Sequence, residues 1–302
     1  MRMTDEPNSA HSAKDAPVVC QGAVCVPVRG VRAGREFTAQ DWVADEMPVA
    51  LEYNGISHAV MLATPLDLED FALGFSLSEG ILGAPHELFA VDEERSGMGI
   101  TLHLQVASGP FARLKERRRS LTGRTGCGLC GTESLAHVTR NLRVLSPVGL
   151  PWRREAVSRA MSKLGELQDL QHVTGAVHAA AWCSADGQVQ WLREDVGRHN
   201  ALDKLIGALA ANQVDASNGF IAVTSRASFE MVQKAALAGV SLLAAVSAPT
   251  SFAVATAQRM GMTLVGFARK QDLVVYCHAD RLELDLVDGD RPDGFGRPGI
   301  AR

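Results

Sequence analysis

Short apolar segments alternate with amphipathic segments through the second half of the chain. The apolar segments lack strict polar alternation, which is expected of strands covered on both faces. We therefore predict a sheet flanked by helices, preceded by a hairpin at Asp186–Gly187 in "AVHAAAWCSADGQVQWLRE". The predicted strands are "GFIAV", "VSLLAAV", "MTLVGFA" and "LVVYCH", and the helices that alternate with them are "NALDKLIGALAA", "SFEMVQKAALAG" and "SFAVATAQRMG".

The first half of the chain has a different pattern, typical of an α+β unit. The segment "PVALEYNGISHAVML" predicts two strands around Asn54–Gly55, a pair that favours a type I′ hairpin turn. A helix is predicted over 64–82, capped by Thr64, with Pro65 in its first turn and Gly80 at its end. The alternation in "GITLHLQVA" predicts a half-buried strand.

These patterns predict an α/β fold with a larger α/β/α domain and a smaller N-terminal α+β domain. The chain has 302 residues, of which 46% are hydrophobic, and this suits one large core or two smaller ones. We place the smaller domain at 18–125, a cysteine-containing loop at 126–135 and a nucleotide- or cofactor-binding domain at 136–286. A disordered tail is expected at 1–17 and a flexible one at 287–302.

The charge balance and the hydropathy argue against several classes of protein. A net charge of −4 and a pI near 6.1 do not fit a general nucleic-acid binder. No apolar run reaches the ~20 residues that span a bilayer. The N-terminus lacks the apolar core of a secretory signal. We therefore expect a cytoplasmic protein that acts without a membrane, with its six cysteines reduced at rest.

Four connecting segments of the second half carry its polar residues. "EDVGRHN" (194–200), "TSRAS" (224–228) and "SAPTS" (247–251) each follow a predicted strand and open a helix, and "GFARKQ" (266–271) follows the next strand. If the strands are parallel, these segments gather at the carboxyl edge of one sheet, where open α/β sheets bind ligands. Three helix N-termini at that edge would offer free N–H groups, which favour phosphate.

Cations at this edge strengthen the expectation of a nucleotide or a nucleotide-like ligand. Asp195 adds an acceptor for the amide edge of guanine. Helix capping explains each Ser, Thr or Asn taken alone. Four such segments at one edge, three of them with arginine, indicate a ligand. Neither GxGxxG nor a Walker A loop is present, so an ordinary dinucleotide or ATP site is not expected. The candidate ligand-binding residues are Asp195, Arg198, His199, Asn200, Thr224, Ser225, Arg226, Ser228, Ser247, Thr250, Gly266, Phe267, Ala268, Arg269, Lys270 and Gln271.

The second candidate centre is the cysteine pair in "TGRTGCGLCGTES" (122–134). Cys127 and Cys130 lie among four glycines and follow the basic segment "FARLKERRRSLTGR" (111–124). That segment is interpreted either as a solvated helix face, the more common case, or as a means of holding an anion beside the thiols. Its cations are Arg113, Lys115, Arg117, Arg118, Arg119 and Arg124.

Several chemistries are open to this pair. Structural zinc needs two further ligands, and the remaining cysteines and histidines offer them only at irregular spacing. A thioredoxin-type dithiol usually follows an apolar strand, and an iron–sulfur cluster needs about four cysteines. A thiolate that accepts sulfur as a persulfide is the remaining interpretation, favoured by the flexible glycines and by nearby Arg124. We therefore expect Cys127 and Cys130 to be catalytic, and no metal site.

Several segments together resemble the FdhD sulfurtransferases, which are accessory proteins of formate dehydrogenase. They extend over most of residues 45–275 in the family's order, and the combination is specific. The matching segments are "YNGISHAVMLATPLDLEDFALGFSLSEGI", "RTGCGLCG", "REDVGRHNALDKLIG", "TSRASFEMVQKAA" and "SAPTS".

The resemblance implies that a cysteine desulfurase loads sulfur onto this loop, with Cys127 as the persulfide carrier. It also implies delivery of that sulfur to the metal of molybdenum bis(molybdopterin guanine dinucleotide), or its tungsten counterpart, for formate dehydrogenase. GDP or GMP would partly mimic this client cofactor, which the family binds where "GFARKQ" falls. The larger domain is expected to look like cytidine deaminase, although the deaminase zinc motifs H-x-E and P-C-x-x-C are missing.

Two other functions remain open at this point. One is a cofactor-binding chaperone whose cysteines only dock a partner, and the other is a structural-zinc or redox protein. A homodimer would let two copies of the ligand-binding edge cooperate, but no residue pattern specifies it.

Overall fold

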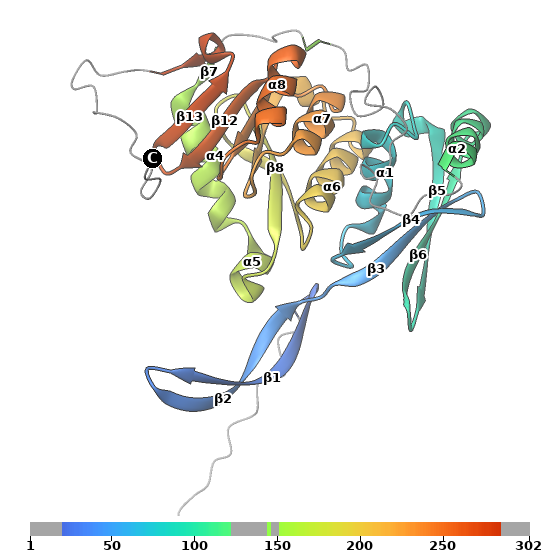
Figure 1. Cartoon of the computed structure of the whole chain (residues 1–302), viewed down its shortest axis with the longest axis horizontal. Helices are drawn as coiled ribbons and strands as arrows, with labels where there is room; N and C mark the ends of the chain where they lie inside the picture. The colour runs from blue at the N-terminus through green and yellow to red at the C-terminus, as the bar shows by residue number, and fades with distance from the viewer. Residues whose placement is uncertain (1–19, 122–143, 146–150, 285–302) are drawn as a thin grey trace, which may run out of the picture.

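The two halves of the chain build separate hydrophobic cores in this computed structural model, which describes residues 20–121, 144–145 and 151–284. The fold is mixed α/β with several sheets (Figure 1). The expected tails and the cysteine loop lie outside the described residues, and the domain boundaries stay a prediction. No helix within the described ranges combines the length and the apolar composition needed to cross a membrane.

The second half forms a six-stranded sheet in the order β13-β12-β11-β10-β8-β9. Neighbours β10, β11 and β12 are parallel, whereas β8 and β13 run against them. Because β9 is antiparallel to β8, it points the same way as the parallel strands. The strands are β8 (His178–Ser184), β9 (Val189–Asp195), β10 (Gly219–Val223), β11 (Leu242–Ala245), β12 (Thr263–Arg269) and β13 (Asp272–Cys277).

Helices cover both faces of this sheet, as the apolar strand pattern predicts. Ile221 and Val223 of β10 pack under one layer of helices, and Phe220 and Ala222 pack toward the opposite face. The first layer consists of α6 (Arg198–Ala211), α7 (Phe229–Leu237) and α8 (Ser251–Met260). The opposite face carries α4 (Arg154–Glu166) with β7 (Trp152–Arg153) and β14 (Leu282–Glu283), and the connections include α5 (Asp169–Thr174), η2 (Ala216–Asn218) and η3 (Ala279–Arg281).

The first half forms a four-stranded sheet in the order β4-β3-β6-β5, packed on its own helices. The predicted hairpin is confirmed, because Asn54 and Gly55 both have positive φ, 45° and 81°. The elements are β3 (Met47–Tyr53), β4 (Ile56–Ala63), α1 (Leu68–Ser78), η1 (Pro85–Glu87), β5 (Leu88–Ser96), β6 (Gly99–Val106) and α2 (Ser108–Leu121).

Helix α1 begins later than its sequence predicts. It starts at Leu68, and the hydroxyl of Thr64 accepts a bond from the N–H of Val196 at 3.1 Å instead of capping the helix. The predicted end is confirmed, since Gly80 has φ 62° just after the helix. The predicted cap at Thr64 is wrong because the Thr64 hydroxyl bonds to a residue distant in the chain and not to the backbone of the helix.

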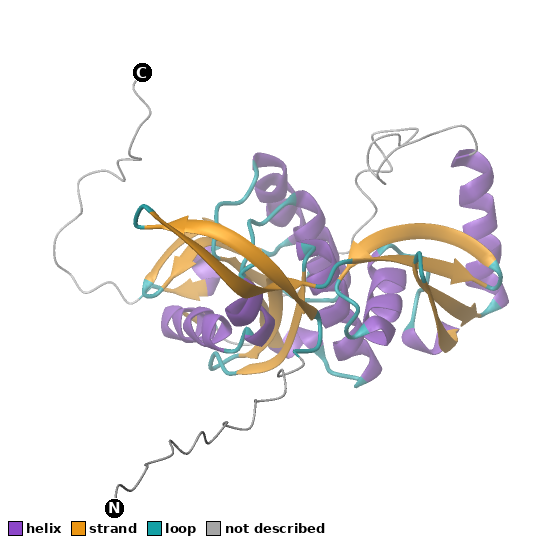
Figure 2. Ribbon diagram, turned by 90° about the horizontal axis from the view of Figure 1, so that it is seen from below, coloured by secondary structure: helices purple, strands orange, loops and turns teal. Residues whose placement is uncertain are grey.

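Helices α1 and α6 cross between the two sheets (Figures 1 and 2). Their backbones meet at glycines: a Cβ on Gly74 would lie 1.7 Å from the carbonyl oxygen of Asp203. A Cβ on Gly207 would lie 1.8 Å from the carbonyl oxygen of Asp70. The two halves therefore pack more closely here than any residue with a side chain would allow.

A two-stranded ribbon, β1 (Ala23–Arg32) with β2 (Arg35–Ala44), precedes the first sheet and extends away from it (Figure 1). It contacts α5. These strands were not predicted, although Val24, Val26 and Val28 alternate before a turn at Ala33–Gly34 with positive φ at both residues.

Candidate functional site

The four polar segments lie at one edge of the six-stranded sheet, as predicted. Strands β9, β10, β11 and β12 all end there, because they point in the same direction. The segments after the first three strands open α6, α7 and α8, so three helix N-termini meet this edge. We call this region the carboxyl edge.

Backbone contacts join neighbouring segments of the carboxyl edge. The N–H of Ser247 donates to the carbonyl of Ser225 at 3.4 Å, and that of Thr250 donates to Ala227 at 3.0 Å. The N–H of Phe267 donates to the carbonyl of Ser247 at 3.3 Å. The segments 224–228, 247–251 and 266–271 are therefore joined to one another through their backbones.

Exposed cations distinguish this surface. Arg226, Arg269 and Lys270 are exposed, and Arg269 is held by a bond from its Nε to the carbonyl of Val246 at 3.1 Å. Arg198 is half-buried at the start of α6, and its buried Nε has no hydrogen-bond partner. Cations beside free helix N–H groups suit a phosphate-bearing ligand.

The segment 266–271 has unusual backbone geometry. Strand β12 is irregular between Gly266 and Arg269, where its register with β13 shifts. A Cβ on Gly266 would lie 2.9 Å from the Pro249 and Tyr276 side chains, so this position has no room for one. Phe267 has φ 51° and is 39% exposed. This bulge turns an aromatic ring outward at the carboxyl edge, and it is followed by the buried Ala268 and, further on, the exposed Gln271.

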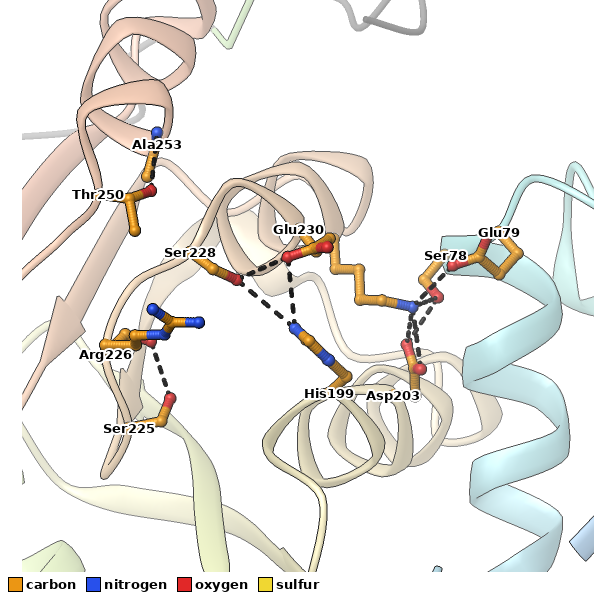
Figure 3. A network of polar contacts seen from close by, with 11 residues as sticks. Ser78, Glu79, His199, Asp203, Ser225, Arg226, Ser228, Glu230, Thr250 and Ala253 are labelled. Atoms are coloured by element: carbon orange, nitrogen blue, oxygen red, sulfur yellow. Dashed lines mark hydrogen bonds and ion pairs between the residues drawn. The ribbon is translucent and has the colours of Figure 1, made fainter. Parts of the chain in front are cut away.

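His199 lies at the start of α6, beside the start of α7 (Figure 3). Its Nε2 is 3.5 Å from the hydroxyl of Ser228 and 3.5 Å from a carboxylate oxygen of Glu230. Burial, together with the charge of Arg198, lowers the pKa of His199 to about 4. The imidazole is therefore neutral at pH 7 and is suited to hydrogen bonding, not to balancing phosphate charge.

Two predicted ligand residues point into the protein. The fully buried Asp195 carboxylate pairs with Lys204 Nζ at 2.7 Å. It also accepts from the backbone N–H of Thr64 at 3.0 Å and of Gly197 at 2.8 Å. The Asn200 amide donates to the same carboxylate at 3.0 Å and to the carbonyl of Leu62 at 2.7 Å. This geometry does not favour the predicted contact between Asp195 and guanine, because the acceptor positions are occupied.

Three hydroxyl residues of the edge also have partners within the protein. Thr250 caps α8, because its Oγ1 accepts from the N–H of Ala253 at 3.3 Å. Thr224 Oγ1 accepts from the N–H of Ala179 at 2.9 Å, and Ser228 donates to Glu230 at 2.9 Å. Capping thus accounts for Thr250, and ligand contacts for all three stay a prediction.

Sequence reasoning missed a buried ion pair beneath this edge. Lys234 of α7 reaches Asp203 of α6 with oxygen distances of 2.8 and 2.9 Å. Its ammonium also contacts Ser78 at 2.8 Å and Glu79 at 3.1 Å, both from the end of α1 (Figure 3). The sequence gives little signal for it, because the helix segment "SFEMVQKAALAG" also carries Glu230 and Gln233, and a lysine in such a helix is usually exposed.

Cys127 and Cys130 lie outside the described residues, so their geometry stays a prediction. Among the described cysteines, burial raises the pKa of Cys183 to about 12 and also raises the pKa of Cys277. Both thiols are therefore poor nucleophiles. No group of three or more metal-ligating side chains stands together within the described ranges.

The basic segment forms α2 as far as Leu121. Arg113 donates to the carbonyl of Ile81 at 3.4 Å and lies 3.9 Å from Glu87. The ammonium of Lys115 lies 4.2 Å from the centre of the Phe111 ring. These contacts fit a solvated helix, and the predicted anion site there is not tested by them.

Comparison with known proteins matches most of the chain, across both halves. A family model described as the FdhD/NarQ family matches residues 44–283. The chain is 65% identical over 268 residues to a protein of Variovorax paradoxus (strain S110) named "Sulfur carrier protein FdhD", covering 89% of this chain and 96% of that protein. A protein of the same name from Xanthomonas campestris pv. campestris (strain B100) is 54% identical over 269 residues, covering 89% and 95%.

The fold is similar to that of proteins with solved structures. One of these is the crystal structure of a putative formate dehydrogenase accessory protein from Desulfotalea psychrophila, with a TM-score of 0.67 over 86% of this chain and 99% of that chain. At 21% sequence identity, this likeness concerns the fold alone.

Proposed function

Because this chain belongs to the FdhD/NarQ family, we propose that it is a sulfur carrier in the maturation of formate dehydrogenase. The observation that carries the proposal is the 65% identity to a named sulfur carrier across 89% of this chain. The carboxyl edge supports it, because a surface with exposed cations and three helix N-termini can hold a large phosphate-bearing client.

The proposed chemistry is transfer of a sulfane sulfur through Cys127. The thiolate attacks the terminal sulfur of a persulfide on a cysteine desulfurase. A new S–S bond forms at Cys127, and the bond to the donor cysteine breaks, which leaves the donor as a thiolate. No electrons are gained or lost in this exchange, so the sulfur arrives ready for a second transfer.

The proposed client is the bis-guanine-dinucleotide pterin cofactor of molybdenum or tungsten, which is cargo and not a resident group. Its phosphates would lie at the starts of α7 and α8, near Arg226 and Arg269, and Phe267 offers a ring for stacking on a heterocycle. Formate dehydrogenase would then receive the cofactor. We place this work in the cytoplasm, where thiols stay reduced, and a homodimer remains part of the proposal.

We also propose a cytidine-deaminase-like arrangement for the larger domain. It is supported by the mixed six-stranded sheet with α6, α7 and α8 on one face and α4 on the other. The chemistry of deaminases is not carried over, because their zinc motifs are missing from this sequence.

The direct test is mass spectrometry of the intact protein after incubation with a cysteine desulfurase and ³⁴S-labelled cysteine. We expect the mass of one added labelled sulfur, located on Cys127, and loss of that mass after a client cofactor is supplied. A protein that binds the cofactor and never gains sulfur would instead be a cofactor-binding chaperone.

Replacing Arg226 by alanine should weaken GDP binding about tenfold or more, because a hydrogen bond from a charged donor contributes roughly 1.5–3 kcal/mol. Titration calorimetry measures this, and GDP should bind more tightly than ADP to the unchanged protein. The matched control is Arg259→Ala, since Arg259 is an exposed arginine in the last turn of α8, at the end opposite the carboxyl edge. Equal losses in both variants would contradict a phosphate contact at Arg226.

A further inference from the structure

A second buried ion pair ties the start of α6 to the first half of the chain. Lys204 of α6 and Asp195 at the end of β9 both have fully buried side chains, and Lys204 Nζ lies 2.7 Å from the Asp195 carboxylate. The same ammonium group donates to the carbonyl of Thr64, directly after β4, at 2.9 Å. Lysine is almost never fully buried unless it is paired, so this contact is a specific feature of the interface between the two halves.

Thr64 contacts the second half of the chain through its N–H, its carbonyl and its hydroxyl. The N–H donates to the Asp195 carboxylate at 3.0 Å, and the carbonyl accepts from Lys204. The hydroxyl accepts from the N–H of Val196 at 3.1 Å. Three contacts made by one buried residue hold the segment after β4 against the residues that lead into α6.

The Asp195 carboxylate also organises the turn that opens α6. Its second oxygen accepts from the N–H of Gly197 at 2.8 Å and from the Asn200 amide at 3.0 Å. Gly197 directly precedes Arg198, the first residue of the helix. A Cβ on Gly197 would lie 2.9 Å from the Asn200 amide nitrogen, so the turn closes tightly around the carboxylate. The direction of the first turn of α6, which carries Arg198, therefore depends on Asp195.

The charge of Lys204 allows this carboxylate to serve an anion-binding surface. A buried carboxylate without its cation is strongly unfavourable, so the turn around Asp195 would not keep its geometry. An uncompensated negative charge at the start of a helix would also repel a phosphate placed there. Because Lys204 balances the carboxylate, the partial positive charge of the helix N-terminus remains available to an anion.

We propose that Lys204 is a positioning residue of the carboxyl edge. Its ammonium group joins Thr64 to Asp195, and this junction sets the first turn of α6 so that Arg198 and the N–H groups of the helix N-terminus face a phosphate. The proposal rests on the proposed function, since it explains how one of the phosphate-binding helix starts is held. Thr64 is fully buried, so the first half of the chain acts on ligand affinity only through the turn that Thr64 holds.

The test is titration calorimetry of the full chain with pyrophosphate and GDP, on the unchanged protein, Lys204→Met and Lys234→Met. Lys234→Met is the matched control, because it breaks a buried lysine–aspartate pair whose partners are Asp203, Ser78 and Glu79. We expect Lys204→Met to weaken both ligands about tenfold or more, as for a lost hydrogen bond from a charged donor, and Lys234→Met less than about twofold. Equal losses would overturn the proposal, because they would reflect only the lower stability that both variants share.

A milder change tests the same junction from the first half, should Lys204→Met fail to fold. Thr64→Val replaces the hydroxyl by a methyl group of similar size and removes the acceptor of the Val196 N–H. We expect it to weaken pyrophosphate about threefold to tenfold, as loss of one neutral hydrogen bond predicts. Thr64→Ser keeps the hydroxyl and should bind within about twofold of the unchanged protein. Full affinity in Thr64→Val, or the same loss in Thr64→Ser, would contradict the positioning role.

Hydrogen exchange of the backbone separates this proposal from the proposed function. The N–H groups of residues 196–201 should exchange faster in Lys204→Met than in Lys234→Met, whereas those of β10 and β11 should exchange alike in the two variants. Equal exchange at 196–201 would overturn the proposal without any ligand. Failure of the unchanged protein to bind pyrophosphate and GDP would contradict the phosphate site, and the exchange rates would still decide whether Lys204 holds the start of α6.

Discussion

Replacing Cys127 by alanine should abolish sulfur delivery to formate dehydrogenase while leaving folding and GDP binding intact. A persulfide needs a thiolate, and alanine has none. The buried thiols Cys183 and Cys277 cannot substitute, because burial raises the pKa of both. The measurement is persulfide mass labelling beside activation of the dehydrogenase, and Cys25→Ala, which removes an exposed thiol of β1, is the matched control.

Cys130→Ala separates the roles of the two cysteines. Cys130 could attack a persulfide on Cys127, which would release sulfide and leave a disulfide between them. We therefore expect Cys130→Ala to retain some persulfide loading on Cys127. If Cys127→Ala still activates the dehydrogenase and Cys130→Ala does not, the two roles are the reverse of those proposed.

Replacing Lys234 by methionine should lower the free energy of unfolding by about 3–5 kcal/mol, because the Asp203 carboxylate would stay buried without its cation. Asp203 is 1% exposed and Lys234 is 6% exposed, so water cannot hydrate the carboxylate in place of the ammonium group. Urea unfolding measures the change. The matched control is Lys163→Met, since Lys163 pairs with Glu166 at the surface, where we expect a change of less than about 1 kcal/mol.

The loss in Lys234→Met should depend on pH. Burial raises the pKa of the Asp203 carboxyl in the folded protein. The folded variant therefore keeps a proton that the unfolded chain releases, and stability falls as pH rises from the ordinary carboxyl range through the raised pKa. The difference from the unchanged protein should be smaller at pH 5 than at pH 8. A difference that does not vary with pH would show that Asp203 is not the group left unpaired.

Local chemistry explains which parts of this fold the sequence can predict. The turn at Asn54–Gly55 needs positive φ at both residues, and the turn at Asp186–Gly187 needs it at Gly187, so a two-residue signal is sufficient in each case. The apolar strands and the polar segments after them place the carboxyl edge, because parallel strands connected by helices must end on the same side.

The direction of a side chain at that edge depends on distant residues, and the sequence does not specify it. Asp195 turns inward because Thr64 and Lys204 meet it there, and Thr64 lies 131 positions away in the chain. Thr64 does not cap α1 because its hydroxyl bonds to the backbone of Val196, which is also distant in the chain.

The glycine crossing of α1 and α6 has a consequence for the order of events on the ribosome. Helix α1 leaves the exit tunnel long before α6, since residues 79–197 are made in between, which takes roughly 6–24 s at about 5–20 residues per second. During that interval Gly74 has no partner backbone, and the face of α1 beside it remains uncovered. The first half of the chain, which carries α1 and the four-stranded sheet, therefore exposes this apolar helix face until α6 has been made. We expect this half to need a chaperone when it is synthesised alone.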